Sequence, residues 1–329
     1  MNNHKTWTLV ALLVAGFQLF TQAVRADNND PLPRTIPLGI YMVELHDFDP
    51  KGSSFQADFW LWARTPPDMA NWIPSLDYPT GIHTEQVNTT EQMFDGARWA
   101  CTNVSGKFRK DWKLKNFPLD RLHLQIPIEE STLDASKLRF SADTINSSAK
   151  ETVLPAGWRL RNFTIQSGVH HYATNFGNPA KPAHSSSEYA SLTIDIEIER
   201  ESFAVFWKLT AIPYIATILA FLSFFVVFDS FLMFPRFSLL IGSLFAACVS
   251  MRGLNSELGT ADVFTLLDSI HVATLVYIFF GILCTIASRE MFHRHVAEKK
   301  IFFWNAISGI SSLGIYTTVN VALAWNALH

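Results

Sequence analysis

The sequence predicts an all-β extracellular domain, an immunoglobulin-like sandwich, followed by an all-α bundle of four transmembrane helices. Two observations lead to this prediction. Between residues 34 and 200, apolar and polar residues alternate in short runs, which is typical of strands with one buried and one solvated face. Between residues 201 and 329 the alternation stops and apolar segments follow, most of them with the roughly 20 residues that a bilayer-spanning helix needs.

The first 26 residues have the pattern of a cleaved signal peptide. Lys5 supplies the positive charge, residues 8–20 form the apolar core, and residues 24–26 offer small side chains for cleavage. The alternative is a membrane anchor, but the apolar core is short for roughly 30 Å of hydrocarbon. We therefore expect the mature chain to begin near Asp27 and its first domain to be exported.

The alternating region, residues 34–200, is the predicted sandwich. Its clearest stretch runs from Leu192 to Glu199, where leucine and isoleucine alternate with threonine, aspartate and glutamate. Segments rich in proline, glycine, asparagine and serine separate the runs, for example residues 49–54 and 177–187. Many short antiparallel strands without intervening helices indicate a sandwich.

The predicted spans of the second domain cover residues 206–228, 237–254, 265–287 and 301–323. The second span contains serine and glycine, so we expect it to face other helices or water rather than lipid. The loop after the third span carries the basic residues Arg289, Arg294, Lys299 and Lys300, and the positive-inside rule places such a loop in the cytoplasm. We therefore predict a multi-pass protein of the plasma (inner) membrane, surrounded by lipid, with its N-terminal domain outside or periplasmic.

Composition and motifs argue against several classes of function. The formal net charge of −3 gives no reason to expect a nucleic-acid partner. Three cysteines, two of them inside predicted spans, provide neither a disulfide framework nor a Cys/His metal-binding pattern. Since no HExxH, GxSxG, P-loop or GxGxxG motif occurs, we expect no enzyme, no catalytic residues, no cofactor and no metal centre.

Several motifs follow one another in a fixed order along both domains. Trp72 stands two residues before Pro74, residues 114–120 read Leu-Lys-Asn-Phe-Pro-Leu-Asp, Arg200 ends the alternating region, and Pro213 lies in the first span. This series resembles the pentameric ligand-gated ion channels, also called Cys-loop receptors. There, a loop similar to residues 114–120 lies at the base of the sandwich, and an arginine precedes the first membrane helix.

The resemblance continues through the second span, because the spacing from Arg236 to Asp268 equals that of family members without a gap. Lys110 and Leu124 replace the cysteines that bracket the loop in animal receptors. Together with the short loop between the third and fourth spans, this departure resembles the bacterial branch. The resemblance implies a homopentamer in which a small-molecule or proton agonist opens a pore for monovalent ions.

The second span carries one stripe of residues spaced 4, 3, 4, 3 and 4 apart, as on one face of a helix. The stripe consists of Ser238, Gly242, Phe245, Val249, Arg252 and Ser256. The resemblance implies that it lines the pore, where rings of Phe245 and Val249 would close the pore by dewetting. The alternative is that Phe245 packs against a neighbouring helix.

Charge selectivity is expected to depend on the same stripe. No acidic residue occurs between Asp229 and Glu257, while Arg252 lies on the stripe. Because rings of basic charge favour anions, we expect an anion-selective pore. The alternative is that Arg252 pairs with Glu257 or Asp262 and leaves little electrostatic field in the pore. In that case the channel could be cation-selective.

The resemblance places the ligand site between adjacent sandwiches, in an aromatic box with a carboxylate. The candidate ligand-binding residues are Asp77, Glu129, His170, Tyr172 and Tyr189. A carboxylate beside aromatic faces favours a small amine as agonist, through ion pairing and cation–π attraction. The rival hypothesis is gating by protons, because His170, His171 and His184 lie in or beside the capping loop.

Coupling between the two domains is expected at Asp120 and Arg200, supported by Phe117 and Pro118 of the same loop. In the family, equivalent residues pair at the junction. The alternative is that Arg200 extends to lipid headgroups. The competing functional class is a membrane-anchored receptor that does not conduct, but such an anchor would need one span and no polar stripe.

Overall fold

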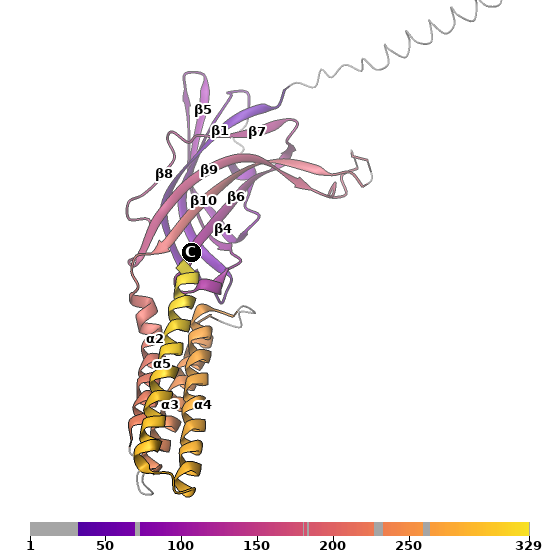
Figure 1. Cartoon of the computed structure of the whole chain (residues 1–329). Helices are drawn as coiled ribbons and strands as arrows, with labels where there is room; N and C mark the ends of the chain where they lie inside the picture. The colour runs from indigo at the N-terminus through magenta and orange to yellow at the C-terminus, as the bar shows by residue number, and fades with distance from the viewer. Residues whose placement is uncertain are drawn as a thin grey trace, which may run out of the picture.

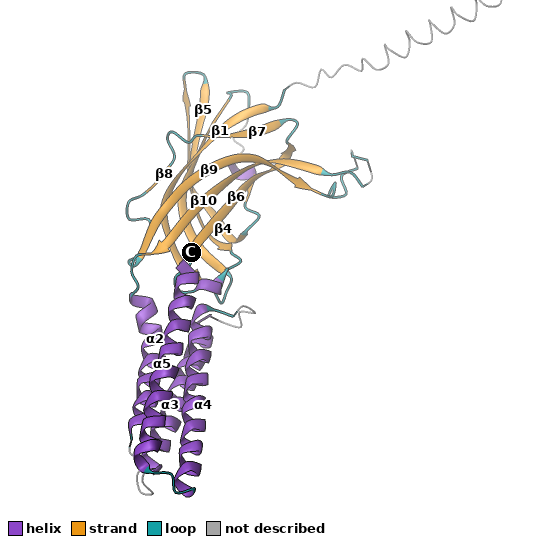
Figure 2. Cartoon of the chain, viewed as in Figure 1, coloured by secondary structure: helices purple, strands orange, loops and turns teal. Residues whose placement is uncertain are grey.

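The structure, a computed structural model, describes residues 32–69, 73–179, 181–182, 184–226, 233–258 and 264–328. It has a two-sheet β domain followed by four long helices (Figure 1), which confirms the predicted order of a sandwich and a helical bundle. Strands occupy one end of an elongated molecule and helices the other (Figure 2). The predicted signal peptide lies outside the described residues, as does Trp72.

Two sheets form the sandwich. The first has the order β4 (Gly81–Phe94), β5 (Ala97–Arg109), β2 (Ser54–Thr65), β1 (Arg34–Asp49) and β7 (Leu138–Ala142), with β8 (Ser148–Ala149) also on β1. The second has the order β3 (Leu76–Asp77), β6 (Arg121–Asp134), β10 (Ser187–Arg200) and β9 (Trp158–Tyr172).

The strands differ from the sequence-based expectation in two respects. The expected strands were short and antiparallel, but β1 has 16 residues and β9 has 15. The strand β1 also pairs in parallel with β7 and β8. Some interruptions in the alternation, such as those of β1, arise at register shifts within a single strand rather than at strand ends.

The core of the sandwich follows the alternation of its strands. In β10, Leu192, Ile194, Ile196 and Ile198 are fully buried, while the residues between them are partly solvated. They face apolar side chains of the first sheet, including a cluster of aromatic rings around Phe108. Burying a side chain of this size stabilises the fold by about 1.5–3 kcal/mol. Period-two patterning therefore accounts for both sheets and their packing.

Four helices follow, and all are long and apolar enough to cross a membrane, which indicates a membrane protein. They are α2 (Ala204–Leu222, continued by the 3-10 turn η3, Ser223–Phe225), α3 (Met233–Leu258), α4 (Leu266–His293) and α5 (Glu298–Leu328). The four helices agree with the predicted spans in number and order. The last two helices extend beyond the predicted spans, residues 265–287 and 301–323.

The helix α5 is long enough to reach the sandwich. Its 31 residues rise about 46 Å, more than the roughly 30 Å of a hydrocarbon core. Near its end, Ala327 is buried in the same apolar cluster as Leu114 of the short turn η2 (Leu114–Asn116). The C-terminus accordingly lies beside the base of the sandwich (Figure 1). The two domains therefore share apolar packing at their junction.

Small residues allow the helices to approach closely. A Cβ atom added to Gly281 of α4 would lie 2.9 Å from Leu240 Cδ2 of α3. One added to Gly309 of α5 would lie 2.9 Å from the ring of Phe224. Small residues at helix contacts are the usual means of close packing in membranes. Larger side chains at either glycine would push the helices apart.

Candidate functional site: aromatic box, helix stripe and junction

Four of the five predicted ligand-binding residues meet at one end of the second sheet. Glu129 lies on β6, while Tyr189 of β10 stands opposite His170 of β9 in the strand register. Tyr172 Oη donates a hydrogen bond to Glu129 Oε2 at 2.7 Å, and His170 Nδ1 contacts Glu129 Oε1. The ring of Tyr172 stacks on His170 at 4.4 Å and lies 6.0 Å from Tyr189.

Phe176 completes this group, and sequence reasoning did not single it out. Its ring lies 5.2 Å from Tyr172 and 6.2 Å from Tyr189, and it is exposed. Its φ of 53° is unusual for a bulky residue. Thr174 Oγ1 supports that turn by accepting a hydrogen bond from the Phe176 amide at 3.1 Å. We call Glu129, His170, Tyr172, Phe176 and Tyr189 the aromatic box.

The two carboxylates near the box differ in their surroundings. Glu129 is only 4% exposed, and its oxygens contact His170 and Tyr172. Burial and the hydrogen bond to Glu129 raise the pKa of Tyr172 to about 12, which keeps that hydroxyl a donor at neutral pH. Asp77 is exposed and stands opposite Glu129 in the pairing of β3 with β6. Glu129 therefore shapes the box, and Asp77 is the carboxylate accessible to a ligand.

The other two histidines of the capping loop lie apart from these contacts. His171 Nδ1 lies 3.5 Å from Glu188 Oε1, an exposed pair on the strand surface. His184 is exposed and has a φ of 60°. The loop is anchored instead by Lys181, whose Nζ lies 2.6 Å from Asp134 Oδ2. Of the three histidines, His170 alone belongs to the box.

The predicted stripe lies on the exposed face of α3. Phe245 is 72% exposed and Val249 is 54% exposed, and the rest of the described stripe is exposed as well, namely Ser238, Gly242 and Arg252. The opposite face packs against the other helices through buried residues, including Leu240, Ser243 and Ala247. The side chain of Ser256 lies outside the described residues.

Arg252 is the basic residue of this stripe. Its side chain is exposed, and the partners considered for it, the Glu257 side chain and Asp262, lie outside the described residues. Charged side chains of membrane-spanning helices usually face protein or a water-filled cavity rather than lipid. A face that combines serine, glycine and arginine is therefore better suited to water or to another protein surface than to lipid.

Arg236, two residues before Ser238, points the other way. Its side chain is 1% exposed, its Nη2 donates to Asn305 Oδ1 at 2.8 Å, and its guanidinium lies 5.8 Å from the Phe224 ring. Ser288 Oγ donates to the same Asn305 oxygen at 2.9 Å. Sequence reasoning used Arg236 only as a spacing marker. The structure makes it the link between α3, α4 and α5.

A second polar link joins α3 to α4. His271 is buried, with Nδ1 2.8 Å from the Leu267 carbonyl oxygen and Nε2 3.0 Å from Ser250 Oγ. Because a carbonyl only accepts, the Nδ1 atom carries the proton and Nε2 accepts from the Ser250 hydroxyl. Sequence reasoning missed this contact too, since a single histidine in an apolar helix has no recognisable pattern.

The junction between the domains contains a cavity of about 570 Å³. Its walls include Asp120 and Arg200, and both other predicted coupling residues belong to the same loop as Asp120. The Arg200 guanidinium lies 4.4 Å from the ring centroid of Trp158 and 5.5 Å from that of Phe117. Pro118 is buried and follows a cis peptide bond.

Asp120 and Arg200 share this cavity without forming an ion pair within the described residues. Asp120 Oδ2 and Arg200 Nε are both buried and lack hydrogen-bond partners there. Burial raises the pKa of the Asp120 carboxyl, against the opposing attraction of Arg200. Burial likewise lowers the pKa of Arg200. The two unsatisfied groups line the same cavity, where a bridging water or a small shift would join them.

Comparison with known proteins adds no family to this description. A scan of the sequence against models of protein families and a search of curated proteins both found no match.

Proposed function

We propose that this chain is one subunit of a homopentameric ligand-gated ion channel of the Cys-loop receptor type. The sandwich, with an immunoglobulin-like fold, is the exported receptor domain, and α3 lines the pore in the plasma (inner) membrane. The observation that carries the proposal is the exposed stripe on α3. In one chain, Ser238, Gly242, Phe245, Val249 and Arg252 face away from the other helices.

In a single chain the polar stripe would contact lipid, whereas several copies around an axis would surround it with protein and water. Lipid would leave the Arg252 guanidinium and the Ser238 hydroxyl poorly solvated. A ring of subunits directs the same face to a central column of water, where Phe245 and Val249 form apolar constrictions. The non-conducting receptor explains the sandwich but gives no reason for this stripe.

A small amine is the agonist that best fits the aromatic box. Its rings from Tyr172, Phe176 and Tyr189 offer faces to an ammonium group, and Asp77 supplies an accessible negative charge. The contact between His170 and buried Glu129 favours a second candidate, gating by protons. Protonation of either group changes that contact, so both agonists act on the same box.

The charge of the stripe favours anions. Arg236 is buried among α4 and α5 residues, so Arg252 supplies the basic charge on the described exposed face. A ring of such guanidinium groups attracts chloride and repels sodium.

Current recording from the purified chain in lipid bilayers tests this proposal. Primary amines and steps of pH are applied in turn under a sodium-chloride gradient. We expect agonist-evoked current that reverses toward the chloride potential and moves toward sodium in Arg252→Glu. Lys137→Glu, the same charge change on the sandwich surface, should leave reversal unchanged. A sodium potential in wild type contradicts anion selectivity, and absence of any evoked current contradicts the channel itself.

A further inference from the structure

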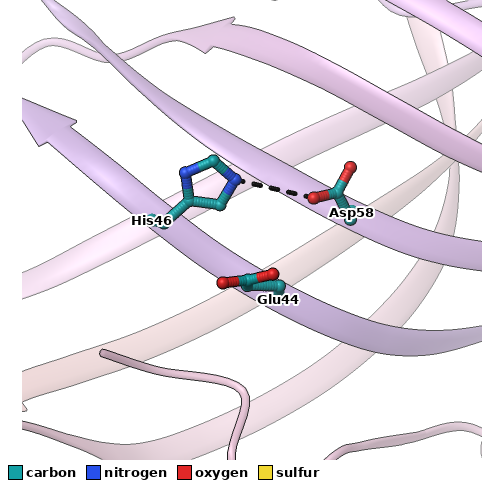
Figure 3. Close-up of side chains that lie close together, drawn as sticks. All are labelled: Glu44, His46 and Asp58. Atoms are coloured by element: carbon teal, nitrogen blue, oxygen red, sulfur yellow. Dashed lines mark ion pairs between the residues drawn. The ribbon is translucent and has the colours of Figure 1, made fainter. Parts of the chain in front are cut away.

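A second group of ionisable side chains lies on the first sheet, away from the aromatic box. Glu44 and His46 are two residues apart on β1, and Asp58 of β2 is the cross-strand partner of Glu44 (Figure 3). Leu45, between the first two, points into the core. One potential ligand atom from each of the three lies within 4.8 Å of the others, and His46 Nε2 lies 3.5 Å from Asp58 Oδ2.

The two carboxylates create an unfavourable arrangement without a cation. Like charges directly opposite each other on paired strands destabilise a sheet. Among the described residues, no lysine or arginine forms an ion pair with Glu44 or Asp58. The basic side chain that lies beside them in the described part of the chain is His46. A bound divalent cation would remove the repulsion.

The imidazole is held by a third carboxylate on its other side. Asp47 Oδ2 lies 3.3 Å from His46 Nδ1 and accepts a hydrogen bond from Gln56 Nε2 at 2.8 Å. Consecutive strand residues normally point to opposite faces, but the φ of 50° at Asp47 and the register shift after His46 break this rule. Carboxylates in this position orient metal-binding histidines and raise the basicity of the ligating nitrogen.

We propose that Glu44, His46 and Asp58 form a zinc site, with Asp47 orienting the histidine and water completing the coordination. One imidazole nitrogen and two carboxylates suit Zn²⁺, whereas Ca²⁺ and Mg²⁺ need shells of six or more oxygen atoms. Ligand bonds of about 2.1 Å place tetrahedral ligand atoms about 3.4 Å apart. His46 and Asp58 already have that spacing, and Glu44 is exposed and free to rotate toward them.

The position of the site suggests what zinc would influence. Asp47 and the next residue, Phe48, line the cavity that also contains Arg200. The Phe48 ring lies 5.0 Å from Trp158, on which the Arg200 guanidinium rests. Zinc bound at His46 holds the end of β1 and so restrains one wall of the junction. The site itself does not depend on the proposed channel function.

Calorimetric titration of the metal-stripped full chain with Zn²⁺, in detergent, tests the site without recording current. We expect one Zn²⁺ per chain and a melting temperature that rises with zinc. His46→Gln and Asp58→Asn should each weaken binding about tenfold or more, as should Asp47→Asn. The control is His83→Gln, because the His83 side chain is exposed and pairs with Glu85 at 3.2 Å, and its loss should leave binding unchanged.

Three results would overturn the proposal. They are absence of zinc binding by wild type, zinc binding that persists in the His46→Gln/Asp58→Asn double variant, and an X-ray absorption spectrum with sulfur ligands, which would assign the metal to cysteine. Melting curves without metal separate loss of zinc binding from loss of folding. Asp58→Asn removes one of the two repelling carboxylates, so without metal it should melt no lower than wild type. A lower melting temperature would contradict the proposed repulsion.

Discussion

Arg200 is the residue at which the two domains meet. Arg200 ends β10, four residues before α2 begins. Its guanidinium lies on the ring of Trp158, and it lines the same cavity as Asp120. The direct pair expected from the sequence is not present in this conformation, since both groups keep buried polar atoms without partners. A gap between two complementary charges at a domain junction is a place where closed and open states would differ.

A double-mutant cycle tests this coupling. Arg200→Ala and Asp120→Ala should each shift agonist activation, and the double variant should shift it by less than the sum. An interaction free energy of about 0.5–3 kcal/mol is expected for groups in one network. If the single effects add without such a term, Arg200 serves only to contact lipid headgroups or the Trp158 ring.

The pH dependence of stability tests the state of Asp120. Its pKa is raised by burial, so the folded state binds the proton more tightly than the unfolded state does. Its charge therefore costs stability at neutral pH, and the cost fades as pH falls through the raised pKa. Asp120→Asn should melt above wild type at neutral pH and converge with it in acid. A constant difference across pH would contradict this assignment.

The aromatic box makes a separate prediction about agonist affinity. Tyr189→Ala removes one ring, and a cation–π contact of about 0.5–2 kcal/mol corresponds to an activation curve shifted about 2- to 30-fold. Asp77→Asn should shift the curve in the same direction, without changing unitary conductance. Tyr41→Ala, an exposed tyrosine on β1, is the matched control. Equal responses in wild type, Tyr189→Ala and Asp77→Asn would place the agonist elsewhere.

Residue pairs across strands show where sequence reasoning reached its limit. The family resemblance pointed to Glu129, soon after the loop at residues 114–120, and to Tyr189, after the loop at residues 177–187. Phe176 depends on a left-handed turn, and the group of His46 and Asp58 depends on the register and bulge of a hairpin. Neither has a periodic signal, since register is set by contacts rather than by spacing along the chain.

At the scale of elements, α3 has two faces of different character. One packs against α2 and α4, while the other carries the stripe. The helical spacing of the stripe was enough to predict this division, because residues three and four apart share a face. The buried face was harder to predict, because Arg236 bonds to Asn305 of α5, far along the chain, and Asn305 in turn bonds to Ser288 of α4.

Truncating the apolar rings of α3 tests the position of the proposed gate. Phe245→Ala should widen and hydrate the constriction, giving leak current or activation at lower agonist concentration. Phe279→Ala removes another exposed ring, from α4, and should leave gating unchanged. Wild-type gating in Phe245→Ala together with leak in Val249→Ala would move the gate one turn along the helix.

At the scale of the whole molecule, the order of the two domains could be predicted from the sequence pattern, but the contact between them could not. Alternation and hydropathy separate the sequence near Arg200 with little ambiguity. The reach of α5 back to the sandwich is visible only in three dimensions, where Ala327 joins the core cluster. The sequence signal for this contact was a helix longer than the hydrocarbon core is thick. The predicted end of the span at residue 323 was too early to reveal it.

Substituted-cysteine accessibility along α3, read as agonist-evoked current, tests the central claim most directly. The native thiols Cys101, Cys248 and Cys284 are first replaced by serine, since Cys248 is exposed on α3 itself. A charged thiol reagent should then alter current through variants with cysteine on the stripe, at positions 238, 242, 245, 249 and 252. It should leave current unchanged for cysteines on the packed face, at positions 240, 243 and 247. Modification that ignores this division, or none at the stripe, would contradict a pore lined by α3.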